Sequence, residues 1–301
     1  MKPIVPLLAL FLLLPCAGSD AATLSARPWC FGRFYVQVPE NAILAEEIQT
    51  YDGITLRIRA LGSDSYGTFQ TRRHDEIVEG AKAPPVKEYH WSDGMDGILF
   101  VADPSAPSGL MLEGHRSLGD NVFVATASGE ISKGPQMEKA VLEVLRAFLP
   151  GEGADGKRPG LCIAGGVLPE PIRSSEEVHA TIELPRPGAA LEIETAVLAP
   201  TGKAKPTAAG AALDKQTVVL RQGPKTIAGM SGTETVIAKT DAAGISLHAR
   251  FDGGDVSRLP QPEFHLHLAT GPDVGHRSGW VSQKKFLKLW DTVLASVAEH
   301  P

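Results

Sequence analysis

Hydrophobic and polar residues alternate along most of this chain, in short runs that end at glycine, proline or aspartate. Such alternation is typical of strands with one buried face. In the first half these runs are FYVQVPENA, GITLRIRAL, VKEYHWSD, GILFVADP, GLMLEGHRS and NVFVATASGE. In the second half they are EVHATIELP, LEIETAVLAP, KTIAGMSGTETVIAKT, GISLHARFD and EFHLHLATG.

Three segments have helical spacing instead. Residues 66–81 carry charged flanks around a few apolar positions, and residues 134–150 and 282–301 each place their apolar residues on one face. Ser282 is the expected N-cap of the last helix. An amphipathic helix and a half-buried sheet each need a surface to pack on. The pattern therefore predicts an α+β fold of two domains, each a mainly antiparallel sheet with a covering amphipathic helix.

A polar stretch without apolar residues to bury divides the two halves. It is GEGADGKRPG, residues 151–160, and its glycines, charges and proline are typical of a linker. We therefore expect an N-terminal domain over 23–150 and a C-terminal domain over 161–301.

The first residues have the pattern of an export signal. Lys2 precedes an apolar run, residues 4–14, that is too short to span a bilayer, and small residues follow it. We predict a signal peptide over residues 1–22, and hence a periplasmic protein if the source is bacterial. The alternative is a lipid anchor on Cys16, but Pro15 stands where such signals carry a small residue.

Charge and hydropathy exclude several classes of partner. The net charge is −6 and the sequence pI is about 5.9, whereas nucleic acids and anionic membranes favour clusters of Lys and Arg. After the signal, no apolar stretch reaches the length of about 20 residues that a membrane helix needs. We expect neither a nucleic-acid partner nor a membrane span.

Two cysteines remain once residues 1–22 are removed, Cys30 and Cys162. In an oxidising compartment an even number of cysteines is compatible with one disulfide. The alternative is a pair of separate buried thiols.

The motifs of catalysis are weak. AGMSGTE around Ser231 has Gly229 two residues before the serine, but Thr233 stands where a nucleophile elbow needs a second glycine. We interpret Gly232 and its neighbours as a hairpin turn. An exported serine hydrolase using Ser231 is therefore the less favoured alternative.

Metal and cofactor motifs are weak as well. His265 and His267 share one face of a strand, and His248 lies on a neighbouring strand, but other ligands at recognisable spacing are missing. We interpret these histidines as solvent-facing. The sequence also lacks a phosphate-binding loop, a Walker lysine and a CxxC pair. We therefore predict no cofactor, no metal and no enzymatic activity.

A protein-binding hairpin is the better-supported kind of site. Residues 83–97 combine Tyr89 and Trp91 with Asp93 and Asp96, a mixture of aromatic anchors and charges that interfaces favour. The alternative is that Trp91 packs on its own sheet.

Several phrases of this chain resemble one known family. They are CFGRFYVQVPENA, LCIAGGVLPEPIRSSEEVHATIELP, LRQGPKTIAGMSGTETVIA, FHLHLATG and FLKLWDTVLASV, which in this order are spread over residues 29–298. They are similar to the periplasmic immunity proteins that bacteria pair with type VI secretion phospholipase effectors.

The resemblance implies a two-domain protein that catalyses nothing and neutralises a cognate phospholipase effector in the periplasm. It also implies turn roles for Gly229, Gly232 and Glu234, and we expect a Cys30–Cys162 bridge to tie the first strands of both domains together. An exported envelope protein that binds lipid or acts as a scaffold is the alternative function.

Overall fold

A computed structural model describes most of the chain after the predicted signal. The described residues are 26–101, 109–151, 159–163, 166–169, 175–185, 188–198, 216–254, 261–272 and 281–300. The predicted signal, Cys16 and most of the predicted linker lie outside them.

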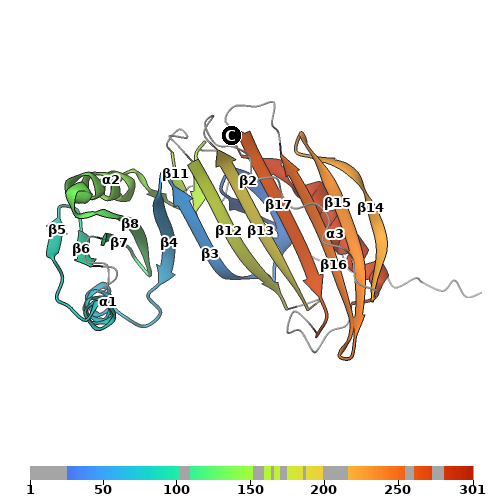
Figure 1. Ribbon diagram of the computed structural model, residues 1–301, viewed down its shortest axis with the longest axis horizontal. Coiled ribbons are helices and arrows are strands. Elements are labelled where there is room, and N and C mark those ends of the chain that lie inside the picture. Colours follow the sequence, from blue (N-terminus) through green and yellow to red (C-terminus); the bar gives the residue numbers. More distant parts are fainter. Residues whose placement is uncertain are drawn as a thin grey trace, which may run out of the picture.

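One 12-stranded antiparallel sheet runs through both halves of the chain (Figure 1). Its strands, in spatial order, are β14 (Thr217–Ile227), β15 (Met230–Asp241), β16 (Gly244–Gly254), β17 (Gln261–Thr270), β13 (Ala189–Leu198), β12 (Ser175–Leu184), β3 (Ile43–Tyr51), β4 (Ile54–Ala60), β8 (Asn121–Glu130), β7 (Gly109–Leu118), β6 (Met95–Val101) and β5 (Lys87–Trp91).

The predicted strands are present, but one predicted run is divided and the structure has further strands, among them β3 and the first part of β14. The run from Lys225 to Thr240 is not one strand, because a turn at Ala228 and Gly229 divides it between β14 and β15. Both turn residues have positive φ, 48° and 80°, as a tight hairpin requires. Strand β3 was not predicted from the sequence, since its exposed positions carry Ile43 and Ala45 beside the expected polar residues.

Two small sheets lie against the large one. The first contains β1 (Ala26–Phe31), β2 (Phe34–Pro39) and β18 (Ala298–Glu299), and the second contains β10 (Leu161–Ile163), β11 (Gly166–Leu168) and β9 (Leu149–Pro150). β2 therefore pairs with the strand just before it and with the last strand of the chain.

The helices follow the prediction closely. They are α1 (Tyr66–Ala81), α2 (Gly134–Ala147), which follows the short 3-10 turn Ile131–Lys133, and α3 (Gln283–Ser296). Ser282 caps α3 by accepting a hydrogen bond from the Lys285 backbone N–H at 3.4 Å. α2 packs on β7 and β8, whereas α3 packs on β2 and β16. The predicted α+β class, with antiparallel sheets and covering helices, is confirmed.

The layer beneath the second half is held by aromatic and charged contacts. The Phe34 ring of β2 lies 4.9 Å from the Phe264 ring of β17. Arg33, in the turn before β2, pairs with buried Glu176 of β12 through two nitrogen–oxygen contacts, at 2.5 and 2.7 Å. The small sheet that contains β2 and the helix α3 together cover one face of β12, β13, β17 and β16, which are neighbours in the large sheet.

α1 lies on the opposite face and only over the first half. Its Phe69 packs with Leu61, Val122 and Val124 in a small separate cluster. The same face of the second half carries no described helix (Figure 1).

The two halves meet at a narrow part of the sheet. β3 pairs with β12 over almost its whole length, but with β4 only from Gln49 to Tyr51. β4 in turn pairs with β8 from Thr55 to Ala60. The predicted division into domains 23–150 and 161–301 stays a prediction, because the strands of both halves share this one sheet.

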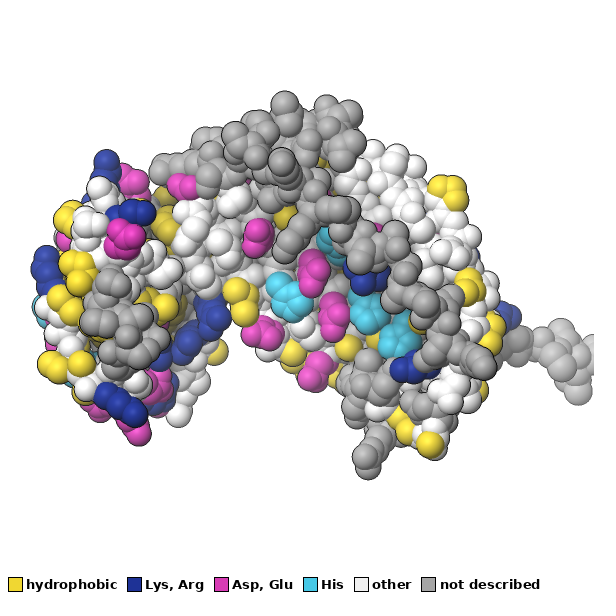
Figure 2. Space-filling model, viewed as in Figure 1, with side chains coloured by type: hydrophobic (Ala, Val, Ile, Leu, Met, Phe, Trp, Pro, Cys, Tyr) yellow, Lys and Arg dark blue, Asp and Glu magenta, His cyan; other side chains and the backbone are white. Residues whose placement is uncertain are grey.

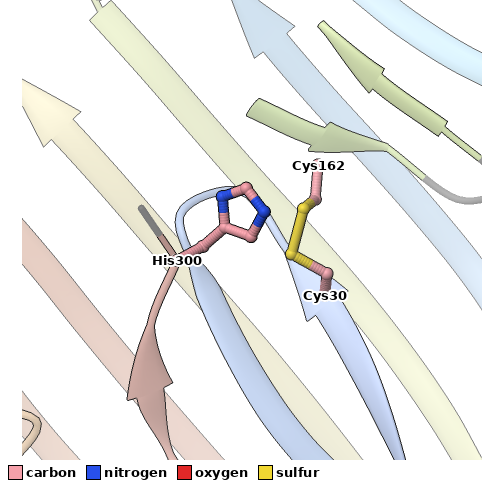
Figure 3. A group of neighbouring side chains, drawn as sticks. All are labelled: Cys30, Cys162 and His300. Atoms are coloured by element: carbon pink, nitrogen blue, oxygen red, sulfur yellow. A yellow bond between two sulfur atoms is a disulfide. The ribbon is translucent and has the colours of Figure 1, made fainter. Parts of the chain in front are cut away.

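A disulfide between Cys30 and Cys162 connects β1 to β10, with the two Cα atoms 5.7 Å apart. The imidazole of His300 lies beside the two sulfur atoms (Figure 3). Of the two interpretations left open by the sequence, the bridge is therefore the correct one.

A candidate protein-binding face on the large sheet

Strands β12, β13, β16 and β17 expose a polar face on the side away from α3. Along β12, for example, Val178, Ala180 and Ile182 are buried while His179 between them is part-exposed. The side chains that share the open side form what we call the histidine face: Glu177, His179, Glu183, Glu192, Glu194, His248, Arg250, Asp252, Glu263, His265 and His267.

Figure 2 shows histidine and carboxylate side chains gathered over these strands, where the molecule is hollowed between its two halves. The strand register explains why they alternate. His179 stands opposite Glu194, Glu194 opposite His265, and His265 opposite Asp252. Imidazoles and carboxylates therefore follow one another across four strands.

The contacts along this first row are close. His179 Nδ1 lies 3.3 Å from Glu194 Oε1, and His265 Nδ1 lies 2.8 Å from Asp252 Oδ1. Arg250 Nε also donates to Asp252 Oδ1, at 2.7 Å. Burial raises the pKa of Asp252, but the hydrogen bonds from His265 and Arg250 outweigh it and lower the pKa below its usual value. Asp252 is therefore a carboxylate at neutral pH.

A second row runs beside the first. Glu192 stands opposite His267, and His267 stands opposite Arg250. His267 Nδ1 lies 3.0 Å from Glu192 Oε2, and His267 Nε2 lies 3.3 Å from His248 Nδ1 on β16. Carboxylates outnumber Arg250, the one guanidinium of the face, so the histidine face is acidic when its imidazoles are neutral.

The predicted binding hairpin lies elsewhere, at the β5 edge of the sheet. Tyr89 is buried with 7% of its surface exposed, and its ring stacks on that of half-buried Trp91 at 5.2 Å. The Trp91 ring lies directly over Gly97 of β6, where an added Cβ would come within 2.6 Å of it. Trp91 thus packs on its own sheet, as the alternative interpretation proposed.

The two acidic residues of that hairpin have local roles. Asp93 lies in the β5–β6 turn with φ of 66°. Asp96 accepts a hydrogen bond from the Tyr66 hydroxyl at 3.1 Å and lies 2.9 Å from His90 Nδ1. A role of Tyr89, Trp91, Asp93 and Asp96 in binding stays a prediction.

The segment around Ser231 is a strand and not a turn. Gly229 lies in the β14–β15 turn as expected, but Ser231, Gly232 and Glu234 lie within β15. The expected turn roles of Gly232 and Glu234 are therefore wrong. Glu234 is buried and accepts a hydrogen bond from Trp290 Nε1 of α3 at 2.6 Å, which ties the helix to the sheet.

In the described residues, one group of three side chains meets the distance requirement of a metal site: Cys30, Cys162 and His300 (Figure 3). Its two cysteines are joined to each other in the disulfide, whereas a metal ligand must be a thiolate. The disulfide therefore explains why these side chains are close together, and the group is not a metal site. No helix in the described ranges has the length and apolar character needed to cross a membrane.

Known proteins resemble this chain in sequence and in structure. The family described as Tle cognate immunity protein 4 C-terminal domain matches residues 156–301. A search of curated proteins found no match.

Solved structures match over most of the chain. The apo immunity protein TplEi of the type VI secretion system (T6SS) from Pseudomonas aeruginosa matches with a TM-score of 0.69 and 18% identity, over 92% of this chain and 97% of that one. A chain of the Tle4–Tli4 complex matches with a TM-score of 0.70 and 17% identity, over 92% and 98%. TplEi complexed with "L" peptide gives 0.65 and 18%, over 92% and 98%.

These structures show that the fold is shared, and the family match covers the half of the chain that carries the histidine face. Residues 156–301 therefore match the model of the Tle cognate immunity protein 4 C-terminal domain, on a fold that the solved T6SS immunity proteins share along most of the chain.

Proposed function

We propose that this protein is an immunity protein that binds and neutralises a type VI secretion phospholipase effector in the periplasm. The observation that carries the proposal is the family match over residues 156–301, on a fold that T6SS immunity proteins share along most of the chain. The relative named in the Tle4–Tli4 complex is bound to its partner. Binding is therefore the activity to expect of this chain.

The histidine face is the surface that we assign to the effector. Its side chains are anchored on four neighbouring strands, so their positions are fixed before binding. Glu194 and Glu192 remain about half exposed, at 57% and 48% of their side-chain surface, and can accept hydrogen bonds from a partner. Because carboxylates dominate the face, we expect Lys and Arg on the effector surface that contacts it.

Neutralisation requires no chemistry by this chain. A partner seated in the hollow of Figure 2 would be contacted on an extended surface, which is sufficient to block an active site or to hold its lid closed. Ser231 lies in the β15 strand, opposite Thr226 of β14 and Gly254 of β16, and is not on a sharp strand-to-helix turn. We therefore propose a binding protein and not a hydrolase.

Two features support a periplasmic location. The disulfide Cys30–Cys162 is of the kind that persists in oxidising compartments, and the sequence predicts an export signal over residues 1–22. Lipid carriage would be favoured by an apolar cavity between the halves. A shallow groove in the described part of the chain runs along the outer side of α3, where Leu287 and Ala295 line it together with Lys284, Lys288 and Asp291; it does not lie between the halves.

A survival assay tests the proposal. A neighbouring phospholipase effector is directed to the periplasm of a test bacterium, with and without this protein. We expect rescue by the full chain and loss of rescue when residues 1–22 are deleted. Failure of an exported, folded protein to rescue and to bind the purified effector would contradict the proposal.

A further inference from the structure

We propose that His248 and His267 form a two-ligand site for a divalent transition-metal ion, of the Zn²⁺, Ni²⁺ or Cu²⁺ class, and that Glu192 orients it. The site lies on the histidine face but does not depend on the effector. The proposal rests on the contact between the imidazoles of His248 and His267 and on the contact of the Glu192 carboxylate with the His267 ring.

The spacing of the two nitrogen atoms suits a metal ion. His248 Nδ1 and His267 Nε2 are 3.3 Å apart. Two zinc–nitrogen bonds of about 2.0–2.1 Å at a tetrahedral angle place their nitrogens about 3.3–3.4 Å apart. An ion can therefore enter between the two rings with small rotations of the side chains and no movement of the strands.

The backbone holds both ligands in place. β16 and β17 are paired, with His248 opposite Ala269 and His267 opposite Arg250, so the two histidines are diagonal neighbours on one face. Their ring planes are within 8° of parallel and their centroids are 5.5 Å apart. Ligands on adjacent strands lose little freedom when an ion binds, because the sheet has already fixed their positions.

Glu192 supplies the second layer of the site. Its Oε2 lies 3.0 Å from His267 Nδ1. A carboxylate in this place accepts the Nδ1–H hydrogen bond and leaves Nε2 of the same ring without a proton, ready to bind a metal. Without an ion, His248 Nδ1–H then donates to this Nε2; when the ion binds, His248 takes the tautomer with its proton on Nε2, so that its Nδ1 is also a ligand. Arg250 lies on the same face, but its guanidinium pairs with Asp252: Arg250 Nε donates a hydrogen bond to Asp252 Oδ1 at 2.7 Å.

The same face contains matched controls. His265 and His179 also have a carboxylate at Nδ1, Asp252 at 2.8 Å and Glu194 at 3.3 Å, but these contacts are with acids and not with a second imidazole. A histidine–carboxylate pair alone is thus present three times on this face, whereas the imidazole pair is present once among the described residues. Comparison of these variants separates a built site from general attraction to an acidic surface.

The test is titration of the intact, oxidised chain, purified without a histidine tag, with Zn²⁺ and with Ni²⁺ in a calorimeter. We expect one ion per chain. His248→Gln and His267→Gln should each weaken binding at least tenfold, Glu192→Gln should weaken it about tenfold, as second-layer carboxylates commonly do, and His265→Gln should change it less than twofold. Circular dichroism establishes that each variant is folded.

Ring NMR signals give a second measurement on the unmodified protein. Paramagnetic Ni²⁺ should broaden the signals of His248 and His267 before those of His179 and His265. The proposal is overturned if the wild-type chain binds no ion at millimolar concentration, or if His265→Gln weakens binding as much as His267→Gln.

Discussion

The buried glutamates in the described part of the chain, Glu113, Glu176 and Glu234, each contact an arginine. In the first half, Glu113 of β7 is almost fully buried and is held by Arg73 of α1 at 2.7 and 2.8 Å. His115 Nε2 lies 2.8 Å from the same carboxylate. Arg73 thereby fixes α1 to the sheet face that its few apolar residues cover.

This network predicts a loss of stability in acid. Burial raises the pKa of Glu113, but the hydrogen bonds from Arg73 and His115 outweigh it and lower the pKa from 4.5 to about 2. A group whose pKa is lower in the folded state stabilises the fold above its unfolded pKa, and that contribution is lost as the pH falls from about 4.5 to about 2. The contribution is on the order of 3 kcal/mol.

The measurement is the unfolding free energy as a function of pH. Glu113→Gln should lower the stability at pH 7 and make it less dependent on pH between 4.5 and 2. Glu143→Gln, on the exposed side of α2, should keep the wild-type dependence. An equal acid dependence in Glu113→Gln and in the wild type would contradict the assignment.

Gly232 predicts a second effect at the scale of one residue. A Cβ on this glycine would lie 2.3 Å from the Asp252 carbonyl oxygen and 2.7 Å from Phe251 Cε2. Gly232→Ala must therefore push β15 from β16, at a cost of about 1–3 kcal/mol. Gly223→Ala on β14, where a Cβ would have no neighbour within 4 Å, is the control. Urea denaturation should show a lower midpoint for the first variant only.

At the scale of elements, the sequence predicts helices better than strand partners. Residues 66–81 and the helix after Ser282 form as expected, because apolar periodicity and a cap are local signals. The β14–β15 hairpin was expected to turn around Gly232, but it turns earlier, at Ala228 and Gly229, because these residues stand within an otherwise strand-like run. β3 was missed because its exposed positions include apolar side chains.

The disulfide that joins β1 to β10 predicts an effect on stability. Cys30 and Cys162 are 132 residues apart in the sequence. In the chain-entropy view, their bridge lowers the entropy of the unfolded chain and so raises the free energy of unfolding by about 5 kcal/mol. The double variant Cys30→Ser/Cys162→Ser should lose up to this much stability. A reductant should destabilise the wild type to the same level and leave the double variant unchanged. Equal stability of the oxidised wild type and the double variant would contradict it.

At the scale of the whole molecule, the histidine face was only partly predictable. Alternation within FHLHL places His265 and His267 on one side of a strand. The order of the strands is not sequential, however: β13 lies between β12 and β17, and β12 lies beside β3. The meeting of Glu192, Glu194 and these histidines depends on that order, which no local pattern encodes.

The face predicts how binding responds to charge. Glu177→Lys with Glu194→Lys reverses two exposed charges on β12 and β13 while leaving the strand interior intact. Affinity for the cognate effector should fall at least tenfold, mainly through slower association. Glu143→Lys on α2 should have little effect, and surface plasmon resonance measures all three proteins. Equal affinities would exclude this face as the interface.

The pairing of β2 with β18 bears on how a new copy of the protein matures. β18 is synthesised long after β2, yet the His300 backbone N–H donates to the Arg33 carbonyl at 2.7 Å and closes the small sheet there. A chain still being made therefore has one edge of β2 open, and chaperones and proteases meet it in that state. This layer is complete only after Ala298 and Glu299 have been synthesised.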